Sequence, residues 1–210
     1  MRIEHLRERL RALGAKSGHE QRFLRAWVQA RSLDTRRGRA EDFLPLALRT
    51  ALPSLLADLD HLAHLRSEHP GEDGSARLLV ELADGQTVES VLLPRDGVCV
   101  SSQVGCAVGC VFCMTGRDGL VRQLESAEIV AQVVHMLETT GWDDPGFNIV
   151  FMGMGEPLAN YASMMKAIRI LNAEEGLNVG ARRITVSTVG LAPQIHQLAG
   201  QLERGQLRVV

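Results

Sequence analysis

Residues 99 to 116 read Cys99-Val-Ser-Ser-Gln-Val-Gly-Cys106-Ala-Val-Gly-Cys110-Val-Phe-Cys113-Met-Thr-Gly116 and include all four cysteines of the chain. A cytosolic chain has little use for a disulfide framework, so this tight group of cysteines points to metal or redox chemistry. The last three cysteines follow the spacing C-x3-C-x2-C. Three close thiolates can hold three irons of a four-iron cluster and leave the fourth iron open for a substrate.

Two alternatives exist for these cysteines. One is a zinc knuckle completed by Cys99 or by a histidine, and the other is three buried, inert cysteines. A structural zinc site usually has four ligands in two pairs, and Cys99 precedes the other three by seven residues, across the end of a predicted strand. The spacing therefore favours the cluster with an open iron, which Phe112 is placed to shield from water.

Strands and helices alternate after this segment. We predict strands at 98–100, 148–152 and 183–187, with 206–210 beginning another, and helices from Ser126 (as N-cap) to about Thr139, at 161–172 and at 193–199. The order βαβαβα is typical of a parallel sheet or an α/β barrel.

The region before the cysteines has two different patterns. Residues 1–66 show leucines and aromatic residues at helical spacing, interrupted by glycine and proline, and predict a small helical domain. Residues 76–82 and 87–93 are rich in β-branched and aliphatic residues, and the Asp84-Gly85 pair between them favours a tight hairpin turn.

The predicted fold class is therefore α/β, with a partial (βα) barrel preceded by a small helical N-terminal domain and a β-hairpin. We divide the chain into a helical accessory domain at 1–70, a hairpin connector at 71–95 and the N-terminal part of a barrel at 96–210. A full α/β barrel takes about 250 residues, and far fewer follow the hairpin here. We therefore expect a fragment, a truncated gene product or an incomplete barrel.

The composition is that of a globular protein, with 45% hydrophobic and 23% charged residues. No apolar run approaches the ~20 residues that span a bilayer, and residues 1–10 lack a signal-peptide core, so we expect a cytoplasmic protein without a membrane partner. Residues 1–40 hold eleven Lys or Arg and four Asp or Glu. Such a segment attracts a phosphate backbone, but charge alone favours the solvated faces of helices.

The motifs resemble a known family. The C-x3-C-x2-C spacing with an aromatic residue before its last cysteine is the radical S-adenosylmethionine (SAM) signature. The longer string from Cys99 to Cys106 is similar to that of the RlmN/Cfr family of radical-SAM RNA methyltransferases. The resemblance continues, in family order, through Gly153-Met-Gly-Glu-Pro157 and Arg182-Arg-Ile-Thr-Val-Ser-Thr188, and the barrel it implies is the radical-SAM barrel.

By this resemblance, Cys106, Cys110 and Cys113 hold a [4Fe-4S] cluster, whose open iron binds the amino and carboxylate groups of SAM. One electron from the cluster cleaves SAM and yields a 5′-deoxyadenosyl radical. Gly155 and Glu156 follow a predicted strand and contact the methionyl end of SAM. The structural alternative is a strand-to-helix turn with a glutamate near a helix N-terminus.

The resemblance assigns three further roles. Ser187 contacts SAM, Glu89 accepts a proton, and Cys99 forms a transient disulfide with the cysteine that carries the methyl group. The alternatives are ordinary strand-end chemistry for Ser187 and a solvent-facing hairpin side chain for Glu89. The methyl-carrying cysteine belongs to the C-terminal part of the family fold, and residues 114–210 contain no cysteine.

The family implies methylation of an adenine ring carbon, with C2 favoured over C8, through a methyl-cysteine intermediate. The implied partners are RNA, namely 23S rRNA and in some members tRNA, and an external electron donor such as flavodoxin. We expect this chain alone to bind a cluster and SAM without completing methyl transfer. The rival functions are another radical-SAM reaction, such as activation of an enzyme, and a catalytically inactive iron–sulfur or zinc module that binds RNA.

Overall fold

Four helices open the chain in the computed structural model, which describes residues 2–34, 38–94, 97–141, 146–174, 176–202 and 208–209. They are α1 (Ile3–Ala12), α2 (Ser17–Val28), α3 (Ala40–Phe43) and α4 (Leu46–Asp60). Apolar side chains at helical spacing bury one face of the longer helices, and Leu6, Leu10 and Phe23 are almost inaccessible to solvent. The predicted helical N-terminal region is confirmed up to residue 60.

The helical prediction is wrong at residues 63–66, because β1 (Ala63–Pro70) is a strand. It pairs antiparallel with β2 (Ala76–Leu82), and β2 pairs antiparallel with β3 (Thr87–Leu93). The two predicted hairpin strands are confirmed with their bounds, and Gly85 in the turn has a φ of 79°, which favours glycine. The hairpin thus belongs to a three-stranded unit. The predicted boundary between residues 95 and 96 lies outside the described residues.

The antiparallel unit continues directly into the predicted parallel sheet. β4 (Gly97–Val100) is antiparallel to β3 and parallel to β7 (Asn148–Phe151), which is followed by β8 (Ile184–Val186) and β9 (Arg208–Val209). Among the described residues the sheet has seven strands in the order β1-β2-β3-β4-β7-β8-β9. Of the predicted strand at 206–210, the structure describes only residues 208 and 209.

Three helices follow the parallel strands, as predicted: α5 (Ser126–Thr140), α6 (Tyr161–Asn172) and α7 (Ala192–Leu202). Ser126 is not the N-cap of α5, however. Glu125 takes that position, and its backbone nitrogen donates to the Glu128 carboxylate at 2.7 Å. In the described part of the chain, three short 3-10 helices connect the larger elements, namely η1 (Met114–Gly116), η2 (Pro157–Asn160) and η3 (Ala181–Arg183).

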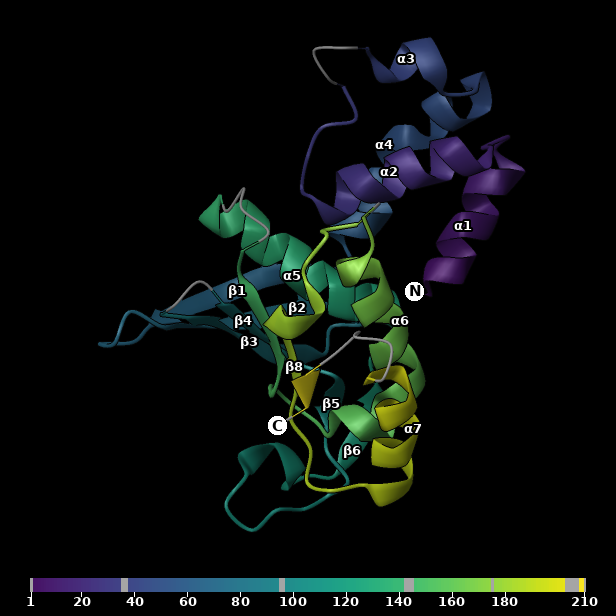
Figure 1. Cartoon of the computed structure of the whole chain (residues 1–210). Coiled ribbons are helices and arrows are strands. Elements are labelled where there is room, and N and C mark those ends of the chain that lie inside the picture. The colour runs from purple at the N-terminus through teal and green to yellow at the C-terminus, as the bar shows by residue number, and fades with distance from the viewer. Residues whose placement is uncertain are drawn as a thin grey trace.

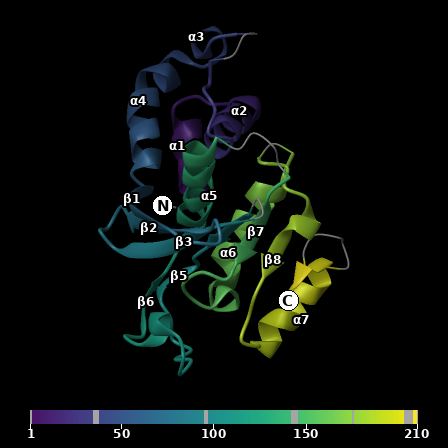
Figure 2. The ribbon, with the colours of Figure 1, turned by 90° about the vertical axis from the view of Figure 1, so that its left-hand side faces the viewer.

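The helical region and the cysteine segment lie at opposite ends of the molecule. The N-terminal helices are at the top of Figure 1 and the loop with the cysteines is at the bottom. Helices α5 and α6 pack against each other along the sheet, which Figure 2 shows from the side of the antiparallel strands. One continuous apolar core extends from Ile3 in α1 to Leu198 in α7. No helix in the described part of the chain is long and apolar enough to cross a membrane.

Candidate cluster and cofactor site

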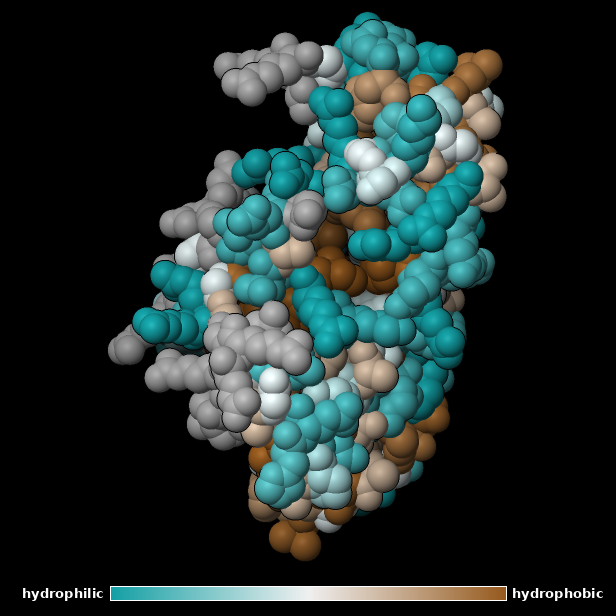
Figure 3. All heavy atoms as spheres, turned by 45° about the vertical axis from the view of Figure 1, so that its right-hand side comes forward, coloured by the Kyte–Doolittle hydropathy of each residue, from teal (hydrophilic) through white to brown (hydrophobic). Residues whose placement is uncertain are grey.

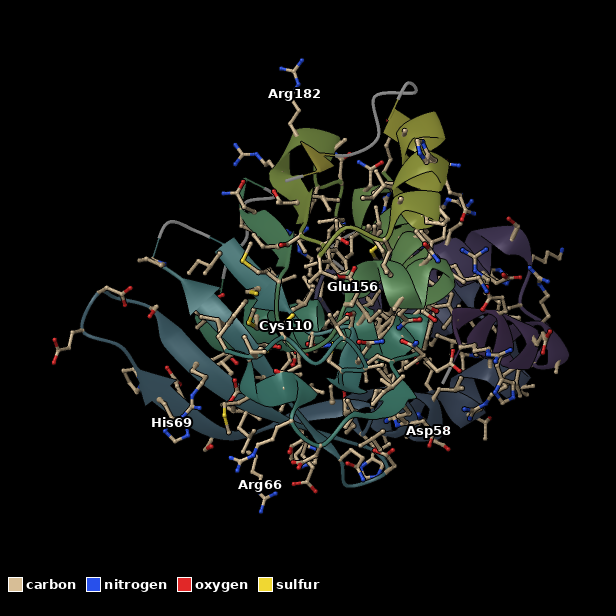
Figure 4. All side chains as sticks on the ribbon, turned by 90° about the horizontal axis from the view of Figure 1, so that it is seen from below. Asp58, Arg66, His69, Cys110, Glu156 and Arg182 are labelled. Atoms are coloured by element: carbon tan, nitrogen blue, oxygen red, sulfur yellow. The ribbon has the colours of Figure 1, made fainter. Side chains whose placement is uncertain are left out.

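The carboxyl ends of three neighbouring parallel strands carry the predicted site residues. They are the cysteine loop after β4, Gly155 and Glu156 after β7, and Ser187 after β8. The antiparallel register pairs Val91 with Cys99, which places Glu89 beside the residues that follow β4. Functional sites of α/β folds form where the carboxyl ends of parallel strands share one edge. Figure 4 views this end of the molecule, with Cys110 and Glu156 near its middle.

A small two-stranded sheet holds the base of the cysteine loop. β5 (Gln103–Gly105) pairs antiparallel with β6 (Leu120–Gln123), and the backbone nitrogen of Cys106 donates to the Gly119 oxygen at 3.0 Å. Further out, the backbone nitrogen of Cys113 donates to the Cys110 oxygen at 3.0 Å and forms a turn. The sequence pattern does not predict this sheet, because strands of three and four residues are too short to show a period.

The outer part of the cysteine loop is open to solvent. Cys106 is buried, Cys110 is half-buried and Cys113 is exposed. The loop lines an open hollow of about 460 Å³. Phe112 is 88% exposed and Val111 is fully exposed, so neither side chain covers a neighbouring part of the described chain.

The donor set fits an iron–sulfur cluster by its chemistry, because three thiols on one loop are the ligands that such clusters take. A hydrogen bond with the Thr115 side chain lowers the pKa of the Cys113 thiol, which favours the metal-binding thiolate. Among the described residues, however, no three His, Cys, Asp or Glu side chains converge closely enough to hold a metal ion. The ligand roles of Cys106, Cys110 and Cys113 therefore stay predictions.

The loop after β7 packs tightly against the segment that leads into the cysteine loop. A Cβ atom at Gly153 would lie 2.8 Å from the backbone nitrogen of Ser101, and one at Gly155 would lie 2.5 Å from the Cβ of Gln103. Gly155 also has a φ of +101°, in the region that favours glycine. The backbone nitrogen of Gln103 donates to the Met154 oxygen at 3.2 Å. Both glycines are thus required by contacts within the chain itself.

The buried carboxylate of Glu156 joins the loops that follow β7 and β8. It accepts hydrogen bonds from the backbone nitrogens of Leu158 and Val189, each at 2.9 Å, and from the Thr188 hydroxyl at 2.8 Å. A carboxylate offers about four acceptor positions, so this chain occupies most of them. Glu156 therefore orders both loops, and its predicted contact with SAM stays a prediction.

A buried polar network beside Glu89 contains two residues that sequence reasoning missed, Ser101 and Gln132. The Ser101 hydroxyl donates to the backbone oxygen of Glu89 at 2.5 Å and accepts from the Met154 nitrogen at 2.8 Å. The Gln132 amide oxygen accepts from the Ser101 nitrogen and the Ser90 hydroxyl, both at 2.9 Å. The network ties the strand of Glu89 to the glycine loop. Its only sequence signal is one glutamine inside the otherwise apolar part of α5.

The other predicted site residues, Glu89, Ser187 and Cys99, lie in or directly after the paired strands β3, β8 and β4. The Glu89 carboxylate is 40% exposed and forms an ion pair with Arg77 at 2.9 Å. Ser187 is half-buried, and its backbone nitrogen donates to the Phe151 oxygen at 3.2 Å. Cys99 in β4 is buried, and this burial raises the pKa of its thiol. Their chemical roles stay predictions.

The fold and the site together define a class of α/β protein in which the first parallel strand leads into a three-cysteine loop at the carboxyl edge of the sheet. Residues 100–209 match the Radical SAM superfamily. The chain belongs to this superfamily, whose cofactors are a [4Fe-4S] cluster and SAM.

Known proteins are similar over nearly the whole chain. A probable RNA methyltransferase of Azoarcus sp. (strain BH72) is 65% identical over 190 residues, which are 90% of this chain and 53% of that protein. One of Thiobacillus denitrificans is 63% identical, over 90% of this chain and 51% of that protein. The crystal structure of a radical SAM methyltransferase from Sphaerobacter thermophilus matches with a TM-score of 0.76 and 41% identity, over 100% of this chain and 61% of that chain. The chain thus spans about half the length of these curated relatives.

Proposed function

We propose that this chain is the cluster-binding and SAM-binding part of a methyltransferase that methylates an adenine ring carbon of RNA. The substrate we favour is C2 of an adenine in 23S rRNA, with tRNA as a second substrate. The observation that carries the proposal is the 65% identity, over 90% of the chain, to a protein named as a probable RNA methyltransferase. The cysteine, glycine-loop and strand-end motifs also occur in an order that resembles that of the RlmN/Cfr family, which supports the same assignment.

Three cysteines and two loops would form the cofactor site. Cys106, Cys110 and Cys113 would hold the cluster, which supplies, when bound, the one-electron chemistry that cleaves SAM. The cysteine loop and the glycine loop are hydrogen-bonded at their bases through Gln103 and Met154. A cluster on the first loop and a SAM molecule on the second would therefore be held at neighbouring places on one sheet edge. Ser187 follows directly after the adjacent strand, β8.

Two further residues would act on the RNA base. Glu89 would accept the adenine ring proton at its carboxylate, which Arg77 orients through an ion pair at 2.9 Å. Cys99 would release the methylated product by attacking the sulfur of the methyl-carrying cysteine, so that a disulfide forms while the bond between that sulfur and the transferred carbon breaks; this cysteine is not among residues 114–210. An external one-electron donor such as flavodoxin would complete the set of partners.

Anaerobic reconstitution of the chain with iron and sulfide tests the cluster assignment. We expect a brown protein with about four irons and four sulfides per chain. Cys106→Ala, Cys110→Ala and Cys113→Ala should each lower the iron content and remove most of the visible absorption. Cys99→Ala is the matched control and should keep both. A colourless protein with one zinc, or an unchanged iron content in the three variants, would contradict the assignment.

A further inference from the structure

A second cavity lies at the other end of the molecule from the cysteine loop, between the N-terminal helices and the end of α6. Its volume is about 350 Å³, which is within the range of small-molecule pockets. Figure 3 shows it as a hollow with a hydrophobic floor and a hydrophilic rim. The apolar residues that line it are Ile3, Leu24, Val28, Ile170 and Ala173.

Three arginines line the same cavity. Arg7 and Arg11 come from α1 and Arg169 comes from α6. Arg11 is neutralised by the buried carboxylate of Glu20, at 2.7 Å. Within the described residues, neither Arg7 nor Arg169 forms an ion pair with a carboxylate, so the described lining carries two uncompensated positive charges.

This lack of partners distinguishes Arg7 from the other arginines of α1 and its N-cap. Arg2 pairs with Glu125 at 3.3 Å and Arg9 pairs with Asp58 at 2.6 Å. The other arginines of α1 and its N-cap are thus paired with carboxylates of the protein itself. Two guanidinium groups at one cavity that have no carboxylate partner in the described part of the chain instead favour an anionic ligand.

Side-chain contacts between the N-terminal helices and the region of α6 hold the walls of the cavity in place. Arg25 donates to the Glu174 backbone oxygen at 2.8 Å, and Gln29 donates to the Gly176 oxygen at 2.7 Å. On the other side, Lys166 pairs with Glu4 at 2.7 Å. The cavity is therefore formed before any ligand binds, which lowers the entropy cost of binding.

We propose that this cavity binds a phosphate ester of about nucleotide size. Its phosphate would lie against Arg7 and Arg169, because the guanidinium fork matches phosphate oxygens in charge and geometry. The apolar part of the ester would lie on the floor beside Leu24 and Ile170. The same chemistry is present in a free nucleotide and in one nucleotide of an RNA strand. The proposal goes beyond the proposed methyl transfer and does not depend on the cluster.

Calorimetric titration of the cluster-free chain with adenosine monophosphate tests this site. We expect saturable binding that is tighter than that of adenosine or inorganic phosphate alone. Arg7→Gln and Arg169→Gln should each weaken binding about tenfold, because each removes a charge-assisted contact. Arg9→Gln is the matched control, since Arg9 is on the same helix and outside the cavity, and it should bind like the original chain.

Two further measurements complete the test. Ala173→Leu fills part of the floor and should weaken the nucleotide while leaving inorganic phosphate unchanged, and circular dichroism checks that every variant is folded. Binding of a short RNA oligonucleotide that depends on Arg7 and Arg169, without binding of the mononucleotide, would support the site and identify its ligand as an RNA strand. Binding that is equal in Arg7→Gln, Arg169→Gln and Arg9→Gln, or the absence of saturable binding by every probe, would overturn the proposal.

Discussion

At the scale of single residues, Glu156 shows how one carboxylate can position two loops. Its side chain is 3% exposed and accepts from Leu158, Thr188 and Val189. A hydrogen bond to a charged group contributes about 1.5–3 kcal/mol, and leaving a buried donor unsatisfied costs a similar amount. The same residue that the sequence marks as a cofactor contact is therefore also a structural requirement of the site.

Glu156→Gln tests this positioning role. The variant keeps the size of the side chain, but its amide NH₂ group would face a backbone or hydroxyl donor. We expect the free energy of unfolding to fall by about 2 kcal/mol, measured by urea denaturation without cofactors. Glu174→Gln, at an exposed position, is the control and should change little. Equal stability of Glu156→Gln and the original chain would refute the role.

The close packing of the glycine loop gives a second prediction at this scale. Gly153→Ala places a Cβ 2.8 Å from the Ser101 nitrogen, which is backbone and cannot move aside easily. We expect a loss of about 1–3 kcal/mol in unfolding free energy. Gly180→Ala should be neutral or slightly stabilising, because φ is −59° there and nothing lies within 4 Å of the new Cβ. Thermal unfolding of both variants decides the matter, and equal melting temperatures would contradict the packing argument.

At the scale of elements, Arg122 connects three parts of the fold that surround the cysteine loop. It lies in β6, the strand that returns from the loop, and pairs with Asp84 in the hairpin turn at 2.7 Å and with Glu128 in α5 at 2.9 Å. These two carboxylates raise the pKa of Arg122, Glu128 contributing most. The base of the loop is thereby tied both to the antiparallel hairpin and to helix α5.

Double-mutant cycles should separate the two ion pairs of Arg122. The Glu128 side chain is 6% exposed whereas that of Asp84 is 45% exposed, and solvent screens the second pair. We expect a coupling energy of about 2 kcal/mol between Arg122→Gln and Glu128→Gln, and less than about 1 kcal/mol between Arg122→Gln and Asp84→Asn. Chemical denaturation gives both values, and the reverse order would show that burial does not govern this connection.

At the scale of the whole molecule, the N-terminal helices share their core with the sheet. The interface between them also contains another cavity, of about 280 Å³, lined by Trp27, His64 and His135 among others. The Nε2 atom of His135 is buried and has no hydrogen-bond partner in the described structure. Burial lowers the pKa of His135, the nearby His64 lowers it further, and Glu138 opposes the shift.

The lowered pKa of His135 predicts that the stability of the fold depends on pH. The folded-state pKa of His135 lies below the ordinary 6.5. The contribution of the neutral, buried imidazole to the free energy of unfolding is therefore fully present above pH 6.5, and it is lost as the pH falls through the folded-state pKa. We expect His135→Leu to match the original chain at pH 7.5 and to be increasingly more stable than it below pH 6.5. Urea unfolding at pH 7.5, 6 and 5 measures this, and parallel curves for the two proteins would rule it out.

Strong local patterns make much of this fold predictable from the sequence. The hairpin strands, α6, the parallel strands and the cysteine spacing all depend on periodicity, turn residues or motif order, which are properties of neighbouring residues. Local patterns mispredict β1, however, because the polar residues of Ala63–Pro70 form a strand only by pairing with β2. They also assign the N-cap to Ser126, whereas Glu125 and Glu128 cap the helix together.

The sequence by itself thus determined the class of fold, the superfamily motif and the candidate ligands, because those are written in residue types and their spacing. Only the tertiary structure decided which distant residues meet. Glu156 binds the loop of Val189, Ser101 joins Glu89 to the glycine loop, and Arg7 and Arg169 line the same cavity. The physical reason is that burial and hydrogen-bond partners depend on strand order and register, which bring together residues that are far apart along the chain.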